Sequence, residues 1–341
     1  MDLTAFPRTR LCNLPTPLYA LDGLTKELSG SQGGPRIFIK RDDLSGLAMG
    51  GNKARQLEFY LGEAIDQGAD TVITTGAIQS NHACMTAAAA AKLGLACHIQ
   101  LETRVPGKGP DYGRTGNPLL DRLFGATIHI FPEGEDEQAA DDAIDAIADD
   151  VREQGGRPYT IHLGGDTKPL GALGYVDAAG ELLHQAAEMG INIDAIVLPS
   201  GSGSTHCGLL AGLRAHGSPA RVLGICIRRD AESQKARIIR RLEAVCTLIG
   251  QPGIATQDDV WLFDDYFGPG YGQSTPEMLE ATALMARVEG ILVDPVYTGK
   301  SLSGLIGLVR NGGIGADENV LFLHTGGLAA MFAYADMLSD L

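Results

Sequence analysis

A lysine stands directly behind two glycines and an asparagine in the segment GGNKARQLEF (50–59), at the start of a predicted helix. The glycines let the backbone turn tightly, and Asn52 is a residue type that can cap the helix that follows. Lys53 would then begin a rigid element while its amine stays free. Such an amine acts as a nucleophile or a base when its pKa is lowered, but the segment alone favours an ordinary surface lysine.

A serine- and glycine-rich turn joins a predicted strand to a predicted helix in AIVLPSGSGSTHCG (195–208). Backbone N–H groups at a helix N-terminus suit a phosphate group. The hydroxyls of Ser202, Ser204 and Thr205 add donors, and Gly203 lets the backbone approach closely. The turn lacks the lysine of an ATP-binding P-loop and the glycine spacing of a dinucleotide fingerprint. A small phosphate-bearing cofactor and an ordinary helix cap are the interpretations left open.

A second polar turn, GAIQSNH (76–82), also follows a predicted strand and opens a predicted helix. Ser80, Asn81 and His82 gather at the helix N-terminus, where backbone amides can hold a carboxylate. Serine and asparagine are also common helix caps, so this turn alone proves little. Together with the phosphate loop and Lys53, it indicates an amino acid bound to pyridoxal phosphate.

The elements that must position these residues follow from hydrophobic patterning. Helix-like segments such as 82–94 and 206–217 lie between short apolar segments. This alternation predicts an α/β fold with a mostly parallel, doubly wound sheet rather than domains joined in tandem. The predicted strands are 36–40, 70–76, 97–102, 127–131, 159–165, 195–201, 222–227 and 319–327.

Composition excludes several classes of function. The 341 residues carry a formal net charge of −15, which argues against nucleic acid as a partner. No apolar run is long enough for a membrane span, and no secretory signal is visible at the N-terminus. The six cysteines lack regular spacing, so free thiols in the cytoplasm are expected. The scattered histidines predict no metal site.

The ordered motifs resemble one family along nearly the whole chain. The chain is similar to fold-type II (tryptophan-synthase-β-like) pyridoxal-phosphate enzymes of the D-cysteine desulfhydrase and 1-aminocyclopropane-1-carboxylate deaminase group. The resemblance implies pyridoxal 5'-phosphate as cofactor and a homodimer. It also implies two domains, each with a doubly wound parallel sheet. The larger, cofactor-binding domain would be formed by residues 1–52 and 164–341, and the smaller domain by residues 53–163. The motifs that carry it are IKRDD (39–43), GGNKARQLEF (50–59), GAIQSNH (76–82), GALGYV (171–176), SGSGSTHCGL (200–209), DDYFGPGYG (264–272), DPVYTGK (294–300) and LHTGG (323–327).

The resemblance also implies roles for individual residues. Lys53 would carry the cofactor covalently and, once the substrate amine displaces it, take the Cα proton. Asn81 would contact the phenolic oxygen of the cofactor, and two tyrosines would flank the substrate. The expected catalytic residues are Lys53, Ser80, Tyr266 and Tyr297; the expected substrate contacts are Ser80, Asn81, His82, Tyr266 and Tyr297; and the expected cofactor contacts are Asn52, Lys53, Asn81, Ser202, Gly203, Ser204, Thr205, Thr298 and Thr325.

Thr298, in DPVYTGK, separates the branches of this family. The deaminase branch has a glutamate at this position, which pairs with the pyridine nitrogen. A threonine hydroxyl supplies only a neutral hydrogen bond and therefore a weaker electron sink. Such a sink suits elimination of a β-substituent better than opening of a cyclopropane ring.

The resulting prediction is a carbon–sulfur lyase that converts D-cysteine into pyruvate, sulfide and ammonia. L-cysteate sulfo-lyase is the first alternative and 1-aminocyclopropane-1-carboxylate deaminase the second. A nucleotide-binding regulatory module is the alternative from a different class. Ala83, Cys84 and Met85 depart from the family pattern one turn from the carboxylate loop, which makes them candidates for setting the substrate preference.

Overall fold

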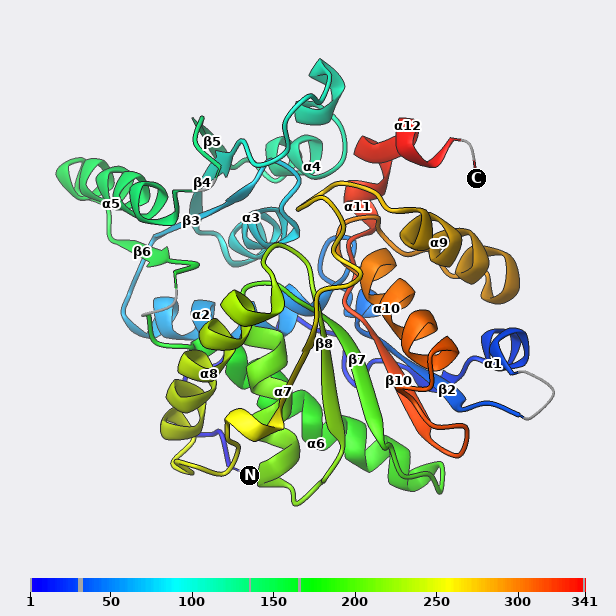
Figure 1. Ribbon diagram of the computed structural model, residues 1–341. Coiled ribbons are helices and arrows are strands. Elements are labelled where there is room, and N and C mark those ends of the chain that lie inside the picture. Colours follow the sequence, from blue (N-terminus) through cyan, green and yellow to red (C-terminus); the bar gives the residue numbers. More distant parts are fainter. Residues whose placement is uncertain (1, 30–32, 135, 165–166, 340) are drawn as a thin grey trace.

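The computed structural model describes residues 2–29, 33–134, 136–164, 167–339 and 341. Over these residues the chain forms two sheets flanked by helices (Figure 1). In the larger sheet all neighbouring strands run parallel except β1, which pairs antiparallel with β2 at one edge. In spatial order its strands are β1 (Leu18–Ala20), β2 (Arg36–Arg41), β10 (Asn319–His324), β7 (Ala195–Ser200), β8 (Arg221–Cys226) and β9 (Val260–Phe263).

The smaller sheet is formed by a continuous stretch of the chain between β2 and β7. Its strands are all parallel, with Val72 of the central strand paired with Cys97 on one side and Tyr159 on the other. In spatial order they are β5 (Thr127–Phe131), β4 (Ala96–Glu102), β3 (Thr71–Ala77) and β6 (Pro158–Ile161).

Helices connect successive strands on both faces of the sheets. The α-helices are α1 (Asp22–Leu28), α2 (Asn52–Asp66), α3 (Asn81–Leu93), α4 (Asn117–Leu123), α5 (Glu137–Glu153), α6 (Leu173–Glu188), α7 (Ser204–Ala215), α8 (Ala231–Leu248), α9 (Pro276–Glu289), α10 (Thr298–Arg310), α11 (Leu328–Met331) and α12 (Ala335–Leu338). Short 3₁₀ helices are η1 (Asp42–Leu44), η2 (Pro110–Gly113), η3 (Leu170–Ala172), η4 (Gln257–Asp259) and η5 (Phe332–Tyr334).

Alternation along the buried strands builds a core on each face of the larger sheet. Ile196 and Leu198 pack with α6, α7 and α8 on one face. Val197 between them packs with α1, α9 and α10 on the other. Because successive side chains of a strand point to opposite faces, an apolar run such as that of β7 is buried on both sides. The larger sheet is therefore doubly wound, as predicted.

The smaller sheet is covered in the same way. Val72 of β3 packs against α2 and α3, while Ile73 packs against Ile144 and Ala148 of α5. Helix α2 also contacts η3 and α6, so it lies between the two sheets (Figure 1). Lys53 at the start of α2 is thereby placed where the two halves of the molecule meet.

Each of the eight predicted strand segments contains a strand, and the predicted α/β fold class is confirmed. The structure adds the short strands β1 and β9. Strand β6 ends at Ile161, earlier than predicted, and residue 165 of that prediction lies outside the described residues. The domain boundaries at residues 52/53 and 163/164 stay a prediction.

The strand ends determine where a site can form. Parallel strands present their carboxyl ends at one edge of a sheet, and ligands of such folds bind there. The loops after β3, β7, β8 and β10 all reach the same pocket from these ends. None of the helices in the described part of the chain is long and apolar enough to cross a bilayer.

Candidate active site

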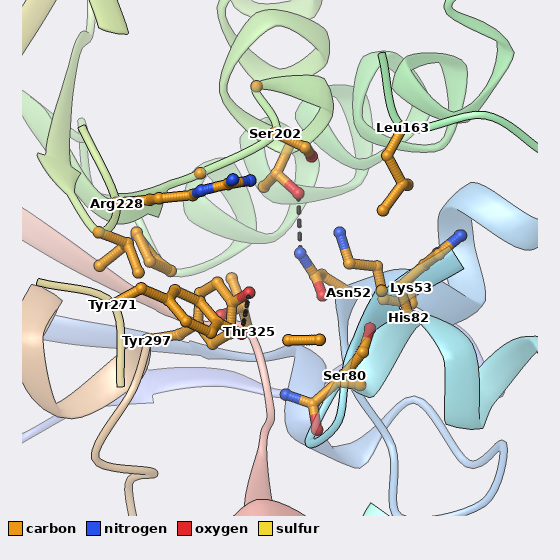
Figure 2. A pocket seen from close by; sticks show the side chains of 18 of the residues that line it. Asn52, Lys53, Ser80, His82, Leu163, Ser202, Arg228, Tyr271, Tyr297 and Thr325 are labelled. Atoms are coloured by element: carbon orange, nitrogen blue, oxygen red, sulfur yellow. Dashed lines mark hydrogen bonds between the residues drawn. The ribbon is translucent and has the colours of Figure 1, made fainter. Parts of the chain in front are cut away.

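One open pocket, with about 1000 Å³ of empty space including its mouth, lies where these loops converge (Figure 2). It brings together residues from distant segments, most of which were predicted from the sequence. The predicted site residues that line it are Asn52, Lys53, Ser80, Asn81, His82, Ser202, Gly203, Thr205, Tyr297 and Thr325. Their placement agrees with the predicted site, while their chemical roles stay predictions.

Lys53 enters the pocket from the first turn of α2. The preceding Gly50 has a positive φ of 75°, and a Cβ atom there would lie 1.8 Å from the carbonyl oxygen of Asp43. Within the described residues, the Lys53 amine makes one long hydrogen bond of 3.4 Å, to Oε1 of Gln56. Burial, with a smaller effect of Arg241, lowers the pKa of Lys53 to about 8. The amine is thus weakly held and readily deprotonated.

Asn52 does not cap α2, which corrects the sequence prediction. Helix α2 begins at Asn52, and Gly51 precedes it without a side-chain cap. The Asn52 amide instead donates a 2.8 Å hydrogen bond to Oγ1 of Thr205, across the pocket (Figure 2). Gln56 donates to the same hydroxyl oxygen at 2.9 Å. Helix α2 is therefore tied to the serine loop that faces it.

The serine loop, residues 201–205, forms the expected turn between β7 and α7. Gly203 adopts a positive φ of 97°, and a Cβ there would meet Ile238 at 2.9 Å and Arg241 at 3.3 Å. Only glycine fits this turn without strain. The first N–H groups of α7 lie at this turn, and they have no hydrogen-bond partners within the helix. This is the geometry of a phosphate site.

Two arginines of α8 support the serine loop from behind. Arg241 donates a 2.9 Å hydrogen bond to Oγ of Ser204, so Ser204 lies behind the loop and not on the pocket wall. Arg237 donates to the carbonyl oxygen of Ser202 at 3.3 Å. Both guanidinium groups are largely buried. They place positive charge beside the predicted phosphate position.

The second polar turn opens α3, and Ser80 is its N-cap. The Ser80 hydroxyl oxygen accepts from the N–H of Ala83 at 3.2 Å, which leaves its own proton free to donate. Oδ1 of Asn81 accepts from Asn117 at 2.9 Å, and the Asn81 amide NH₂ has no acceptor among the described residues, so it can donate as well. Asn117 also bonds to Gln79 on the same turn. The turn is therefore rigid and presents donors to the pocket.

His82 lies beneath this turn as a neutral ring. Its Nε2 lies 3.0 Å from the hydroxyl of Thr74. Nδ1 is buried and has no hydrogen-bond partner among the described residues. Burial, together with the nearby Lys53, lowers the pKa of His82 to about 3. His82 therefore offers the pocket a neutral hydrogen-bonding group and no positive charge.

Ala83, Cys84 and Met85 are buried and do not line this pocket. Ala83 and Met85 belong to the core that covers the smaller sheet. Cys84 faces the buried Asp121 of α4. None of the three lines the pocket, so their influence on the substrate preference stays a prediction.

Two tyrosines face each other on the pocket wall, and one of them was not predicted. The hydroxyls of Tyr271 and Tyr297 lie 3.0 Å apart, with the rings edge to face (Figure 2). Burial raises the pKa of both phenols, so both stay neutral at ordinary pH. Tyr266, the predicted partner, instead packs against Gly307 of α10, where a Cβ would lie 2.2 Å from its hydroxyl. Tyr271 thus occupies the place that was predicted for Tyr266.

Thr298 is fully buried behind Tyr297. Its hydroxyl donates to Oδ1 of Asp294 at 2.7 Å and accepts from the N–H of the same residue at 2.7 Å. The hydroxyl thus completes the first turn of α10. Thr298 does not line the pocket, although the sequence predicted it as a cofactor contact. A hydrogen bond from Thr298 to a pyridine nitrogen stays a prediction, and it would require this proton to leave Asp294.

Charged residues at the pocket mouth were missed by sequence reasoning. Glu137 of α5 accepts from Arg228 at 2.9 Å, from Arg237 at 3.2 Å and from Arg229. Arg104 also lines the pocket and pairs with Glu102 at 2.7 Å. Arg228 and Arg229 could have been predicted from the sequence, because they follow β8 shortly after its end, at the same sheet edge as the other loops. The mouth of the pocket is therefore rich in guanidinium groups.

Comparisons with known proteins agree with this geometry. A family model described as "Pyridoxal-phosphate dependent enzyme" matches residues 9–326. The chain is 43% identical over 332 residues to a D-cysteine desulfhydrase of Salmonella choleraesuis (strain SC-B67) and 42% identical to that of Salmonella typhi, covering 97% of each chain.

Solved structures extend the comparison to the fold. An ACC deaminase homologue has a TM-score of 0.87 at 36% identity, covering 99% of this chain and 97% of its own. An O-ureido-L-serine synthase, with a TM-score of 0.65 at 15% identity over 94% of this chain and 92% of its own, is similar in fold alone. The resemblance predicted from the motifs is confirmed, and the chain belongs to the pyridoxal-phosphate-dependent enzymes of fold type II.

Proposed function

We propose that this protein is a carbon–sulfur lyase that uses pyridoxal 5'-phosphate to convert D-cysteine and water into pyruvate, hydrogen sulfide and ammonia. Identity of 43% to a D-cysteine desulfhydrase over 97% of the chain supports the substrate. The structural observation that carries the proposal is the place of Lys53. Its weakly held amine lies between the serine loop and the Ser80 turn (Figure 2).

The pocket fits this cofactor in two respects. The Nε–H of Arg241 is buried beside Gly203 and has no hydrogen-bond partner among the described residues. The side of the pocket at the serine loop therefore offers a hydrogen-bond donor and a positive charge to a phosphate. The amine of Lys53 has a lowered pKa and can attach to an aldehyde. Ser202, Gly203 and Thr205 would hold the phosphate, and Asn52, Asn81 and Thr325, which line the same pocket, would contact the rest of the cofactor.

Pyridoxal phosphate, when bound, withdraws electrons and makes the Cα–H bond of an attached amino acid acidic. Lys53 is the base for this proton, because a pKa of about 8 lets the free amine accept protons near neutral pH. The Ser80 hydroxyl and the Asn81 amide are free to donate to the substrate carboxylate. The Ser80 turn would thereby hold the carboxylate end of the substrate in the pocket that Lys53 enters.

The tyrosine pair is suited to the other end of the substrate. Elimination breaks the Cβ–S bond, and the electron pair leaves on sulfur, which then takes up a proton. Tyr271 and Tyr297 are neutral phenols that share one hydrogen bond, so one phenolic proton can be given to the sulfur. Hydrolysis of the remaining three-carbon fragment by water gives pyruvate and ammonia.

A product screen tests the proposal. The purified enzyme is incubated with D-cysteine, L-cysteine, L-cysteate, 3-chloroalanine or 1-aminocyclopropane-1-carboxylate, and pyruvate and 2-oxobutyrate are quantified separately. We expect pyruvate and sulfide in equal amounts from D-cysteine, with the highest kcat/KM of the set. Formation of 2-oxobutyrate from the cyclopropane substrate alone would contradict the proposal, and a higher kcat/KM for L-cysteate would replace D-cysteine as the substrate.

Assembly and location belong to the same proposal. We propose that the enzyme is a cytoplasmic homodimer. In support of a reducing compartment, all six cysteines are free thiols, and five of them are buried. The family match supports this enzyme over the nucleotide-binding regulatory module considered from the sequence.

A further inference from the structure

We infer that Lys300 is the positioning residue of the tyrosine pair: its buried ammonium group clamps the loop that carries Tyr271 against the helix that begins at Tyr297. The catalytic use of the pair rests on the proposed function. The clamp itself is a statement about structure and can be tested separately.

The loop that carries Tyr271, residues 264–272, contains no helix or strand. It contains three glycines with positive φ angles, Gly268, Gly270 and Gly272, and is thus a sequence with high intrinsic backbone freedom. Among the described residues, one backbone hydrogen bond lies within the loop, from the N–H of Phe267 to the carbonyl oxygen of Asp264 at 3.2 Å. A loop of this kind needs an outside contact to hold a side chain in one place.

Lys300 supplies that contact. Its ammonium group donates to the carbonyl oxygen of Phe267 at 2.6 Å and to that of Gly270 at 2.8 Å. The second acceptor belongs to the residue directly before Tyr271. Lys300 itself is fully buried. A buried ammonium group is costly unless it is hydrogen-bonded, so the two carbonyl oxygens and the lysine hold each other in place.

The same short segment also fixes the second tyrosine. Asp294 accepts hydrogen bonds at 2.9 Å from the N–H groups of Tyr297 and Thr298, which holds the start of α10. Tyr297 directly precedes α10, and Lys300 lies in its first turn. One helical turn therefore sets the position of Tyr297 directly and that of Tyr271 through Lys300.

The side chain of Tyr271 has a further support that does not depend on Lys300. Its ring packs with Val105, Tyr112 and Tyr334 in a separate small core. Loss of the clamp should therefore loosen the backbone at residues 267–271 without unfolding the protein. We expect such loosening to weaken the hydrogen bond of 3.0 Å between the two tyrosine hydroxyls most.

The decisive experiment is a double-mutant cycle on the holoenzyme. Lys300→Met removes all three donors at nearly constant length, and we expect kcat for pyruvate release to fall roughly 10- to 100-fold, since displacement of a catalytic group by about 1 Å has effects of this size. In a Tyr271→Phe background the same change should cost less than about threefold, because the two residues act as a unit. Tyr266→Phe serves as the control background, in which the full loss should be retained.

Lys40→Met is the matched control for loss of a buried lysine. Lys40 is also almost fully buried and also donates to a carbonyl oxygen, that of Thr16 at 2.7 Å, but it contacts neither tyrosine. Its effect on kcat should be the same factor with and without Tyr271→Phe. Equal losses from Lys300→Met in both backgrounds would overturn the inference.

Hydrogen exchange, followed by mass spectrometry, keeps the test independent of activity. Amides of residues 264–272 should exchange faster in Lys300→Met than in the wild type, and Lys40→Met should leave them unchanged. Unchanged exchange in Lys300→Met would refute the clamp even if the enzyme is an active lyase. Faster exchange in a protein without lyase activity would support the clamp and refute the proposed function. If Lys300→Met does not fold, Lys300→Gln, which keeps a shorter donor, is measured in the same cycle with the same criteria.

Discussion

Replacing Lys53 with alanine is expected to lower kcat for pyruvate release from D-cysteine by roughly 1000-fold or more, because the change removes both the covalent anchor and the base. The serine loop and the Ser80 turn are held by their own contacts with Arg241 and Asn117. The variant should therefore still fold and bind the cofactor without a covalent link. Steady-state kinetics with a pyruvate assay measures the loss.

The control for this prediction is Lys92→Ala, a change of an exposed lysine on α3. This variant should keep the wild-type rate. A small amine such as methylamine should restore part of the activity of Lys53→Ala, because the missing group is itself an amine. If Lys53→Ala turns over D-cysteine at the wild-type rate, Lys53 is neither anchor nor base.

Replacing Asp121 with asparagine is expected to remove one contribution to the pH dependence of stability, namely a loss of stability as the pH rises. Asp121 of α4 is fully buried, and neither carboxyl oxygen has a hydrogen-bond partner among the described residues that meets normal geometry. Burial raises its pKa from 3.8 to about 7, and the neighbouring Cys84 and Arg122 only partly oppose the shift. Cys97 of β4 also faces this carboxyl group.

The sign of the effect follows from proton binding. Between about pH 4 and pH 7 the folded protein holds the Asp121 proton while the unfolded chain has released it. Raising the pH through this window therefore lowers the free energy of unfolding, by at most about 4 kcal/mol in total. Above pH 7 the contribution of Asp121 to the free energy of unfolding no longer changes with pH. Asp121→Asn should lack this slope.

Urea unfolding followed by circular dichroism at pH 5 and pH 8 measures the difference. The free energy of unfolding at pH 8 minus that at pH 5 should be more positive in Asp121→Asn than in the wild type. Asp66→Asn, a change of an exposed aspartate at the end of α2, should keep the wild-type slope. Equal slopes in the wild type and Asp121→Asn would show that another group carries the pH dependence.

The sequence allowed prediction of the fold wherever a local pattern determines the structure. Strands such as β7 and β10 are buried on both faces, so they appear as unbroken apolar runs between turn residues. Strand β1 has three residues, too few to leave a periodic signal. Strand β9 was missed although it has four residues, as many as β6, whose segment was predicted. Each of them forms by pairing with a longer strand, β1 with β2 and β9 with β8. The local sequence pattern does not reveal this pairing.

The site was predictable to the extent that its residues lie in turns with their own chemistry. The two glycines before Lys53 and Gly203 in the serine loop adopt positive φ angles, as their residue type suggests. Asn52 was misjudged because a capping residue type does not reveal a partner such as Thr205, which lies 153 positions later in the chain. The Asn52 side chain forms this tertiary contact instead of capping the helix.

The tyrosines show the same limit. Tyr266 and Tyr271 lie five positions apart in one glycine-rich loop, and nothing in the local pattern tells which of them faces the pocket. The choice is made by α10, whose Gly307 accommodates the ring of Tyr266 and whose Lys300 holds the backbone next to Tyr271. The cluster of Glu137 with three arginines likewise joins α5 to the loop after β8 and to α8, segments that no sequence motif connects.

The covalent attachment of the cofactor is the central claim, and it can be measured directly. Treatment of the purified holoenzyme with borohydride should fix the cofactor on the protein and bleach its absorbance. Because a modified lysine resists trypsin, we predict that mass spectrometry finds the adduct in the peptide of residues 42–55, on Lys53. An adduct on any other lysine, or a protein that stays unmodified, would contradict the assignment of Lys53.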